Sequence, residues 1–375
     1  MKVGVLTFHR ASNYGTALQA FATVEALRGL GFDAELIDYR PEYTERTLRP
    51  RSLRKARSPK EIASILANRL VYGNQQNEKI HRFLSFIKEM PCGTPVCNTP
   101  KELEKAVQDY DVILSGSDQL WNLRITGGDL AYCFPFDHPN KVSYGSSFGE
   151  RTISQERQEL IAPLLKQFRV LGLREETALQ MTRQMVGQDY AGKLCRVIDP
   201  TLLLEAGDWK KHLEPSVKLP KDGYILTYYM IETPILRAVT EKLRKETGLP
   251  VVNIKPSKRQ ILCREGTNMM WAGPREFLSC YAGAKYVVTN SFHGTAFAIN
   301  FGVPMYVAPL PVSMAGEVNS RLVDVLDWYG ISDRWIENEA AVQKVDPKAT
   351  LGDLNQISSL RREESLQTLK DMLQG

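Results

Sequence analysis

At 375 residues, the chain is long for one hydrophobic core and comfortable for two. The composition is that of an ordinary globular protein, with a hydrophobic content of 43% and a charged content of 24%. The net charge of +5 is compatible with anionic substrates and does not require nucleic acid as a partner. No apolar run approaches the ~20 residues of a membrane helix, and the first apolar run is too short for a signal peptide, so we expect a cytoplasmic protein and leave open a place at the inner face of the membrane.

The six cysteines and five histidines do not form a recognisable disulfide or metal-binding pattern. No two cysteines have the C-x-x-C spacing, and we expect reduced structural thiols. No spacing among the histidines resembles a metal site, so we predict neither a metal nor another cofactor. The basic stretch 46–60 contains Pro50 and Pro59 and is best interpreted as a solvated loop, and a membrane-surface or acidic-partner patch is the less favoured interpretation.

Short apolar runs alternate with helical patterns in the first half, which favours an α/β fold with a parallel sheet. The expected strands are 3–8, 34–38, 112–114, 141–145 and 170–173. The expected helices are one that follows Gly15 and then 60–89, 101–108, 155–167 and 175–185.

The alternation starts again after the polar stretch 187–193, which we predict as a hinge. The expected strands there are 195–198, 224–228, 251–254, 286–289 and 305–308, and the expected helices are 234–246, 274–282, 293–301, 318–329 and 353–373. We therefore predict two Rossmann-like lobes that face each other across a cleft. Residues 1–190 would form the N-terminal lobe on the acceptor side, 191–350 the C-terminal lobe on the donor side, and 351–375 a C-terminal helix that packs back on the body.

The junction between the strand 286–289 and the following helix is the strongest candidate for a reactive site. His293 lies there, between Ser291 and Gly294. A helix N-terminus offers unpaired N–H groups and a partial positive charge, which favours anions. An imidazole in that position is pushed toward its neutral form, which suits acid–base chemistry on an anionic substrate. The alternative is a buried structural histidine.

Polar residues also follow several predicted strands of the first lobe. Ligands of doubly wound sheets bind beyond the carboxyl ends of the strands. Hydroxyl, amide and carboxylate groups in such loops suit the recognition of a sugar. The candidates for acceptor binding are Asn13, Tyr14, Gly15, Ser117, Asp118, Gln119, Asn122 and Ser146. An ordinary strand-to-helix turn and a helix N-cap remain the structural alternatives.

Two arginines are candidates for binding an anionic donor. Arg174 directly follows the strand 170–173 and could hold a phosphate or carboxylate through two parallel hydrogen bonds. Arg321 opens a later helix and could do the same. A surface pair of Arg174 with Glu175, and a solvated Arg321, are the alternatives.

Taken together, these motifs resemble those of the polysaccharide pyruvyl transferase family. The stretches that carry the resemblance are NYGTALQA (13–20), ILSGSDQLWN (113–122), SYGSSFG (143–149), LGLREE (171–176), DPTLLL (199–204) and VVTNSFHGTAFAINFGVP (287–304). The family implies a fold similar to the GT-B sugar transferases. It also implies a reaction in which phosphoenolpyruvate gives its enolpyruvyl carbon to two hydroxyls of one sugar, yielding a pyruvate ketal and phosphate without a metal. The acceptor would be a saccharide of a cell-surface polysaccharide or its nucleotide- or lipid-linked precursor.

The resemblance also implies roles for individual residues. His293 matches the catalytic histidine and Arg174 a donor-binding arginine that takes part in catalysis. The expected donor-binding set is Arg174, Asn290, Ser291, Gly294 and Arg321. Some members carry an arginine immediately before the histidine, where this chain has Phe292, so the cation for the phosphate is expected from Arg174, Arg321, Lys255 or Lys258. A nucleotide-sugar glycosyltransferase is the alternative function, and a non-catalytic glycan-binding protein is a further one.

Overall fold

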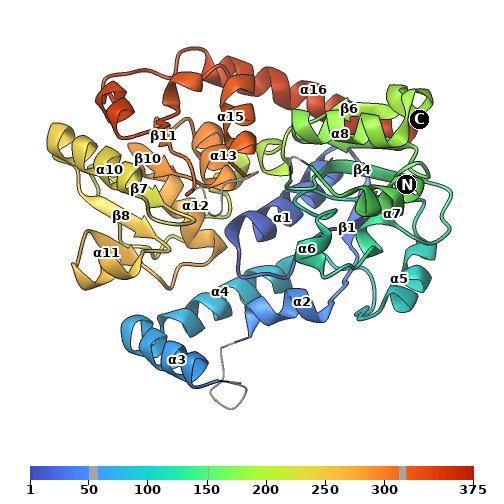
Figure 1. Ribbon diagram of the computed structural model, residues 1–375, viewed down its shortest axis with the longest axis horizontal. Coiled ribbons are helices and arrows are strands. Elements are labelled where there is room, and N and C mark those ends of the chain that lie inside the picture. The colour runs from blue at the N-terminus through green and yellow to red at the C-terminus, as the bar shows by residue number, and fades with distance from the viewer. Residues whose placement is uncertain (50–57, 151, 312–317) are drawn as a thin grey trace.

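The computed structural model describes residues 1–49, 58–150, 152–311 and 318–375, and shows two α/β lobes side by side (Figure 1). Within the described residues, a parallel sheet of six strands forms the first lobe and a parallel sheet of five strands forms the second. The prediction of two Rossmann-like lobes is confirmed. Most of the basic stretch that was predicted as a solvated loop, residues 50–57, lies outside the described residues.

The first sheet has the strand order β2-β1-β3-β4-β5-β6. Its strands are β1 (Lys2–Leu6), β2 (Asp33–Leu36), β3 (Val112–Ser115), β4 (Lys141–Ser146), β5 (Val170–Leu173) and β6 (Leu194–Arg196). Helices cover both faces of a parallel sheet, which is why β3 and β4 are buried along their whole length. The helices of this lobe are α1 (Tyr14–Gly29), α2 (Glu42–Glu45), α5 (Pro100–Ala106), α6 (Leu123–Thr126), α7 (Gln155–Leu165) and α8 (Glu176–Val186).

The strand predicted at 195–198 to open the second lobe belongs to the first sheet. β6 pairs in parallel with β5, and Leu194 lies opposite Leu171. The predicted hinge 187–193 is wrong, because residues 188–193 form a short 3-10 segment that connects α8 to β6 within one lobe. A polar connection that contains glycine has the same sequence pattern whether it links two lobes or two neighbouring elements. A lobe boundary at residue 190 would therefore detach β6 from its own sheet.

The second sheet has the strand order β11-β10-β7-β8-β9. Its strands are β7 (Ile225–Tyr228), β8 (Val251–Ile254), β9 (Thr267–Met269), β10 (Tyr286–Thr289) and β11 (Met305–Val307). The helices around it are α9 (Ala206–Lys210), α10 (Pro234–Thr247), α11 (Lys258–Leu262), α12 (Pro274–Ala282), α13 (Phe292–Phe301) and α15 (Val318–Trp328). The strands β8 and β10 and the helix α12 have the predicted bounds, whereas the short elements α11 and β9 were not predicted.

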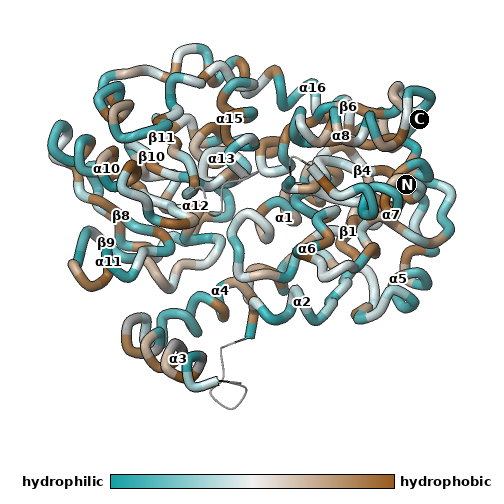
Figure 2. The backbone as a smooth tube through the Cα atoms, viewed as in Figure 1, coloured by the Kyte–Doolittle hydropathy of each residue, from teal (hydrophilic) through white to brown (hydrophobic). Residues whose placement is uncertain are grey.

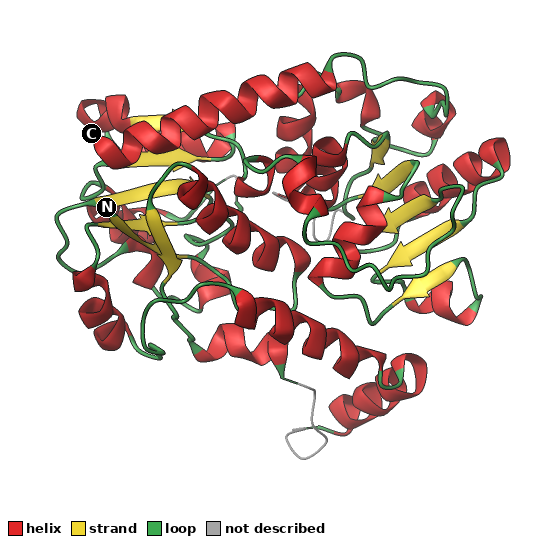
Figure 3. Ribbon diagram, turned by 180° about the vertical axis from the view of Figure 1, so that it is seen from behind, coloured by secondary structure: helices red, strands yellow, loops and turns green. Residues whose placement is uncertain are grey.

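Two helices connect the lobes to each other. α16 (Leu354–Gln374) extends along both lobes, as the view from behind shows most clearly (Figure 3). α4 (Gln75–Glu89), which follows α3 (Pro59–Tyr72), forms ion pairs with α12 through Arg82 to Glu276 and Glu89 to Arg275. None of the helices in the described part of the chain is long and apolar enough to cross a membrane.

One hydrophobic cluster runs through both lobes. It includes Leu114 of the first sheet and Leu226 of the second, both completely buried. Hydrophobic positions accordingly follow the strands of both lobes through the interior of the molecule (Figure 2). Because the strands of each sheet are parallel, the loops after β1 and β3 and the loop after β10 lie at the carboxyl ends of their sheets, where the lobes meet.

Candidate functional site

Three consecutive residues fix the junction between β10 and α13. The Thr289 hydroxyl donates to a backbone carbonyl of β7 at 2.6 Å and accepts from the Ser291 N–H at 3.0 Å. Asn290 bonds through both amide atoms to backbone groups of the loop after β7, at 2.8 Å each. Ser291 is the N-cap of α13 and accepts from the Gly294 N–H at 3.3 Å. These bonds fix the first turn of the helix and therefore the position of His293.

A cavity of about 510 Å³ opens between the lobes at this junction. The loops after β1 and β3 contribute to its wall from the first lobe, and the start of α13 contributes from the second. The structure therefore brings together predicted acceptor-side and donor-side residues. The predicted residues that line it are Asn13, Asp118, Gln119, Asn290, Ser291, His293 and Arg321.

His293 lies at the contact between the two lobes. Its side chain is 12% exposed, and Nε2 is buried without a hydrogen-bond partner among the described residues. The backbone of Gly15, from the opposite lobe, lies so close that a Cβ atom at this position would overlap the imidazole ring. The His293 Nε2 lies 3.7 Å from the Asp199 Oδ2. Burial lowers the pKa of His293 and outweighs the opposing attraction of Asp199 and Asp118, so the imidazole is neutral near pH 7.

Asp199 is the buried carboxylate at the centre of the site. It follows β6 and accepts from the Arg174 Nη1 at 2.6 Å and from the Ser117 hydroxyl at 3.2 Å. Its other oxygen accepts from the backbone N–H and the hydroxyl of Thr201. Burial raises the pKa of a carboxyl group, but the charge of His293 when it is protonated, the charge of Arg174 and the bonds from Thr201 together lower the pKa of Asp199. Asp199 therefore stays ionised beside the imidazole.

Arg174 is enclosed rather than free. It is 3% exposed, its Nε donates to the Glu175 carboxylate at 2.9 Å, and its guanidinium lies 4.2 Å from the centre of the Phe292 ring. A guanidinium over an aromatic face is stabilised by a cation–π interaction. Phe292, at the position where some relatives carry an arginine, therefore covers Arg174 instead of supplying a charge. Arg174 does not line the cavity.

Arg321 is the arginine that lines the cavity beside His293. It is 7% exposed, and its Nε is buried without a partner in the described part of the chain. With its amide oxygen oriented toward Arg321, Gln119 accepts from both terminal nitrogens, at 3.2 and 3.0 Å. Burial lowers the pKa of Arg321, and the nearby charge of Arg174 lowers it further. A guanidinium in this position suits a carboxylate or phosphate in the cavity.

Asp118 lines the cavity from the first lobe and has an unusual backbone conformation. Its φ angle of 80° lies in the left-handed region, which non-glycine residues rarely adopt. One carboxylate oxygen accepts from the Gln119 N–H at 2.9 Å, and the other accepts from the Thr16 hydroxyl at 3.2 Å. The strained conformation directs the loop after β3 toward the cavity.

Several predicted acceptor residues do not reach the cavity wall. Ser146 donates its hydroxyl to the Gly116 carbonyl at 2.7 Å inside the first lobe. Asn122 is the N-cap of α6, and Ser117 bonds to Asp199.

Tyr14 and the glycines have structural contacts. Tyr14 is buried and donates to the Ala272 carbonyl across the lobe contact at 2.7 Å. Gly15 contacts the His293 ring, and a side chain on Gly294 would overlap Thr289, so both glycines act through close backbone approach.

The site also contains groups that sequence reasoning missed. Asp199 begins the stretch DPTLLL (199–204), for which the sequence predicts no role. Its position shortly after β6, which ends at Arg196, and before Pro200 is the signal that could have identified it. Thr16, Tyr43 and Thr47 of the first lobe line the cavity without having been predicted.

One group of described residues has the side chains of a metal site, but its bonding argues against a metal. His9, Asp38 and Cys92 lie close together. The two oxygens of Asp38 accept from Arg40 at 2.7 and 2.6 Å, and His9 Nε2 lies 3.2 Å from the same carboxylate. A cation would have to displace the guanidinium, so the residues do not fit a metal.

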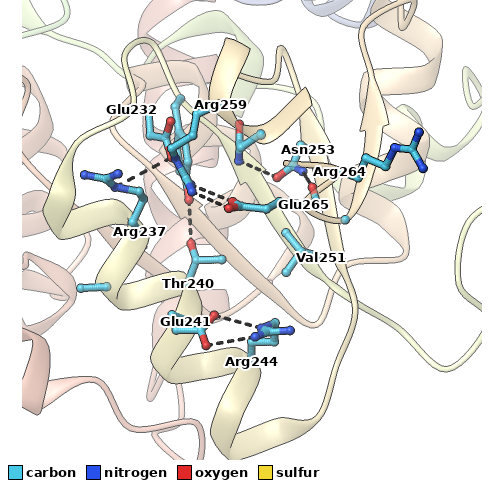
Figure 4. Close-up of a pocket in the computed structure, with 14 residues that line it drawn as sticks. Glu232, Arg237, Thr240, Glu241, Arg244, Val251, Asn253, Arg259, Arg264 and Glu265 are labelled. Carbon is cyan, nitrogen blue, oxygen red and sulfur yellow. Dashed lines mark hydrogen bonds and ion pairs between the residues drawn. The ribbon is translucent and has the colours of Figure 1, made fainter. Parts of the chain in front are cut away.

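A second cavity, of about 560 Å³, lies on the second lobe away from the lobe contact (Figure 4). α10, β8 and α11 contribute its wall. Its charges are largely paired with one another: Arg259 bonds to Glu232 and Glu265, and Arg244 bonds to Glu241. This internal compensation leaves little charge for a ligand.

A family model described as polysaccharide pyruvyl transferase matches residues 13–308. The match covers well over half of the chain and includes the loop after β3 and the start of α13, whereas Arg321 lies beyond the matched range. The chain therefore belongs to the polysaccharide pyruvyl transferase family, a family of transferases, as its motifs predicted. A comparison with curated protein sequences finds no match.

Solved structures whose backbone follows a similar path have low sequence identity to this protein. A UDP-GlcNAc 2-epimerase from Methanocaldococcus jannaschii is 12% identical with a TM-score of 0.49, over 96% of this chain and 99% of that chain. The glycosyltransferase SsfS6 from Streptomyces sp. SF2575 is 12% identical with a TM-score of 0.45, over 99% of each chain. We derive no substrate or activity from likeness at this level.

Proposed function

We propose that the protein transfers a pyruvyl group from phosphoenolpyruvate to two hydroxyls of one sugar, in a cell-surface polysaccharide or its precursor. The products are a cyclic pyruvate ketal and phosphate. The observation that carries this proposal is the placement of His293, which is neutral, enclosed and at a helix N-terminus in the cavity between the lobes. Membership of the family supports the same reaction.

The proposed chemistry assigns proton transfer to His293. The neutral imidazole accepts the proton of the attacking sugar hydroxyl and passes it to the donor methylene carbon, while the hydroxyl oxygen bonds to the adjacent carbon. The second hydroxyl then displaces phosphate at that carbon and closes the ketal, and its proton leaves with the phosphate. Asp199, 3.7 Å away, stabilises the imidazolium that forms between these steps.

The donor anion is assigned to Arg321 and to the N-terminal turn of α13. Arg321 lines the cavity, and Ser291 and His293 lie in the same wall, where helix N–H groups favour negative charge. Arg174 acts through its neighbours as a positioning residue, because it holds Asp199 and stacks on Phe292 without reaching the cavity. The acceptor sugar is assigned to Asn13, Asp118 and Gln119 on the opposite wall.

The test is phosphate release from phosphoenolpyruvate with candidate saccharide acceptors. We expect His293→Gln to lower kcat about 10²- to 10⁴-fold, the usual contribution of a positioned acid–base group. His81→Gln is the matched control, because His81 is exposed on α4. Undiminished turnover in His293→Gln would remove this residue from the mechanism.

A ligand comparison separates the proposal from a nucleotide-sugar glycosyltransferase. In a thermal-shift titration, phosphoenolpyruvate should stabilise the protein, because a ligand that binds only the native state raises its melting temperature. Stabilisation by UDP or GDP together with no response to phosphoenolpyruvate would contradict the proposed donor.

A further inference from the structure

Two lysines lie beside the candidate site with no carboxylate partner among the described residues. Lys79 lies on α4, and Lys255 directly follows β8. Both line one cavity of about 350 Å³, and Lys255 also lines the cavity that contains His293. The two cavities are therefore neighbours that share Lys255, and a ligand that extends out of the candidate site meets this pair of ammonium groups.

The surroundings of Lys79 leave its charge uncompensated. Its Nζ lies 4.6 Å from the centre of the Tyr14 ring and 5.5 Å from that of Phe83, which provide aromatic faces and no carboxylate. Burial, together with the nearby charge of Lys255, lowers the pKa of Lys79 to about 8. Like charges that are brought together in this way cost free energy unless an anion is bound between them.

Lys255 is held in place by its backbone and by a weak contact. Its φ angle of 55° lies in the left-handed region, and its Nζ donates to the Met230 carbonyl at 3.4 Å. A strained non-glycine residue persists only where its surroundings hold it, and such residues cluster at ligand sites.

The acidic residue of this cavity does not neutralise the lysines. The carboxylate of Glu232 accepts from the Ser257 hydroxyl at 2.6 Å and from the Arg259 Nε at 3.0 Å. In the cavity of Figure 4, Arg259 and Arg244 are likewise paired with glutamates. The lysine pair differs from that arrangement because its positive charge is available to a ligand.

We infer that Lys79 and Lys255 form a phosphate-binding subsite at the mouth of the cleft, and that it holds the diphosphate of a nucleotide- or lipid-linked saccharide acceptor. The inference rests on the proposed function, in which the donor occupies the inner site at Arg321. Two separate ammonium groups match two phosphoryl groups, and the cavity shares Met230, Ile231 and Lys255 with the cavity that contains His293. The acceptor class is thus a phosphate-linked precursor and not a finished neutral polysaccharide.

The test titrates the full chain with inorganic pyrophosphate by calorimetry, in the presence of saturating phosphoenolpyruvate. We expect Lys79→Gln and Lys255→Gln each to weaken pyrophosphate binding about tenfold or more, the scale of one charge-assisted hydrogen bond. Lys88→Gln is the matched control, since this exposed lysine lies on α4, as Lys79 does, and does not line the cavity. Unchanged pyrophosphate affinity in both lysine variants, with intact melting curves, would overturn the subsite.

A second titration, with phosphoenolpyruvate alone, distinguishes the sources of the phosphate. We expect the lysine variants to bind phosphoenolpyruvate as the wild type does. A matching loss of phosphoenolpyruvate affinity would assign the lysines to the donor and overturn the acceptor assignment.

Failure of the wild type to bind phosphoenolpyruvate would contradict the proposed function. Pyrophosphate binding, measured without the donor, would still report on the lysines. UDP and a short polyprenyl diphosphate then separate the nucleotide-linked from the lipid-linked acceptor by their affinities.

Discussion

At the scale of single residues, the site places a neutral imidazole beside an ionised carboxylate, with no hydrogen bond between the two groups. His293 loses its proton through burial, and Asp199 keeps its charge because Arg174 and Thr201 stabilise it. Environments that separate the pKa values of neighbouring groups mark acid–base pairs in enzymes. The 3.7 Å separation of the Nε2 and Oδ2 atoms would allow the carboxylate to stabilise an imidazolium without holding the imidazole charged at rest.

The lowered pKa of His293 makes a prediction about stability and pH. In the unfolded chain the imidazole titrates near 6.5, whereas the native state takes up this proton only at lower pH. The stabilising contribution is therefore complete above pH ~6.5 and is lost as the pH falls below that value. When the pH is lowered from 7.5 to 5.5, the free energy of unfolding should fall by about 1 kcal/mol less in His293→Gln than in the wild type. Denaturant unfolding at the two pH values measures both decreases. An equal loss in both proteins would show that His293 is not buried in its neutral form.

Sequence reasoning could predict His293 but not its full environment. The imidazole position follows from local information, namely a buried strand, a serine N-cap and a helical pattern. Asp199 depends on which sheet β6 joins, which is a long-range property that the local pattern does not contain. The orientation of Arg174 depends on Asp199 and Phe292, so a strand-end arginine that was predicted to bind the donor instead holds its neighbours.

At the scale of elements, the start of α1 is as important to the site as the start of α13. The N-terminal turn of α1 comes from the first lobe, and its Gly15 backbone rests against the His293 ring of the second lobe. The sequence predicts Gly15 as an acceptor-binding residue and does not indicate this contact. The sequence placed both turns at strand ends, and only the docking of the lobes determines that they touch.

Two glycines of α1 provide a matched prediction. A methyl group at Gly15 would overlap the imidazole, whereas Gly29, at the other end of the helix, has open space around it. Gly15→Ala should therefore displace His293 and reduce phosphate release strongly. Gly29→Ala should leave activity unchanged and stabilise the helix by up to about 1 kcal/mol.

Steady-state kinetics and melting curves of both variants check this expectation. Full activity in Gly15→Ala would show that the ring and the helix backbone separate without cost. A loss of activity in Gly29→Ala would show that α1 responds to substitutions that do not touch the site.

At the scale of the whole molecule, the two sheets are predictable from alternating apolar and helical patterns, but the lobe contact is not. Tyr14 of α1 stacks on Phe277 of α12 with ring centres 4.7 Å apart, and its hydroxyl bonds to the Ala272 carbonyl. Phe83 of α4 and Tyr228 of β7 complete this aromatic cluster. No periodicity in the sequence indicates that a tyrosine at a helix start belongs to the core of the other lobe.

The shared core predicts that the lobes unfold together. Calorimetry of the wild type should show one transition whose calorimetric and van't Hoff enthalpies agree. Tyr14→Ala, which removes the interlobe ring, should lower the van't Hoff enthalpy below the calorimetric value. Tyr132→Ala is the control, because Tyr132 is buried within the first lobe alone and should lower the melting temperature without separating the lobes. Two resolved transitions in the wild type would contradict a common core.

The contact between Gly15 and His293 also limits how such a protein can be recombined. A chimaera that takes each lobe from a different relative would inherit an intact sheet and intact strand-end loops on both sides. Its imidazole would nevertheless meet a foreign helix start, and a misplacement of about 1 Å is enough to cost about 10²-fold in rate. Exchange of acceptor specificity is therefore expected to succeed by grafting the loop after β3, and to fail by exchanging whole lobes unless the first turn of α1 is retained together with α13.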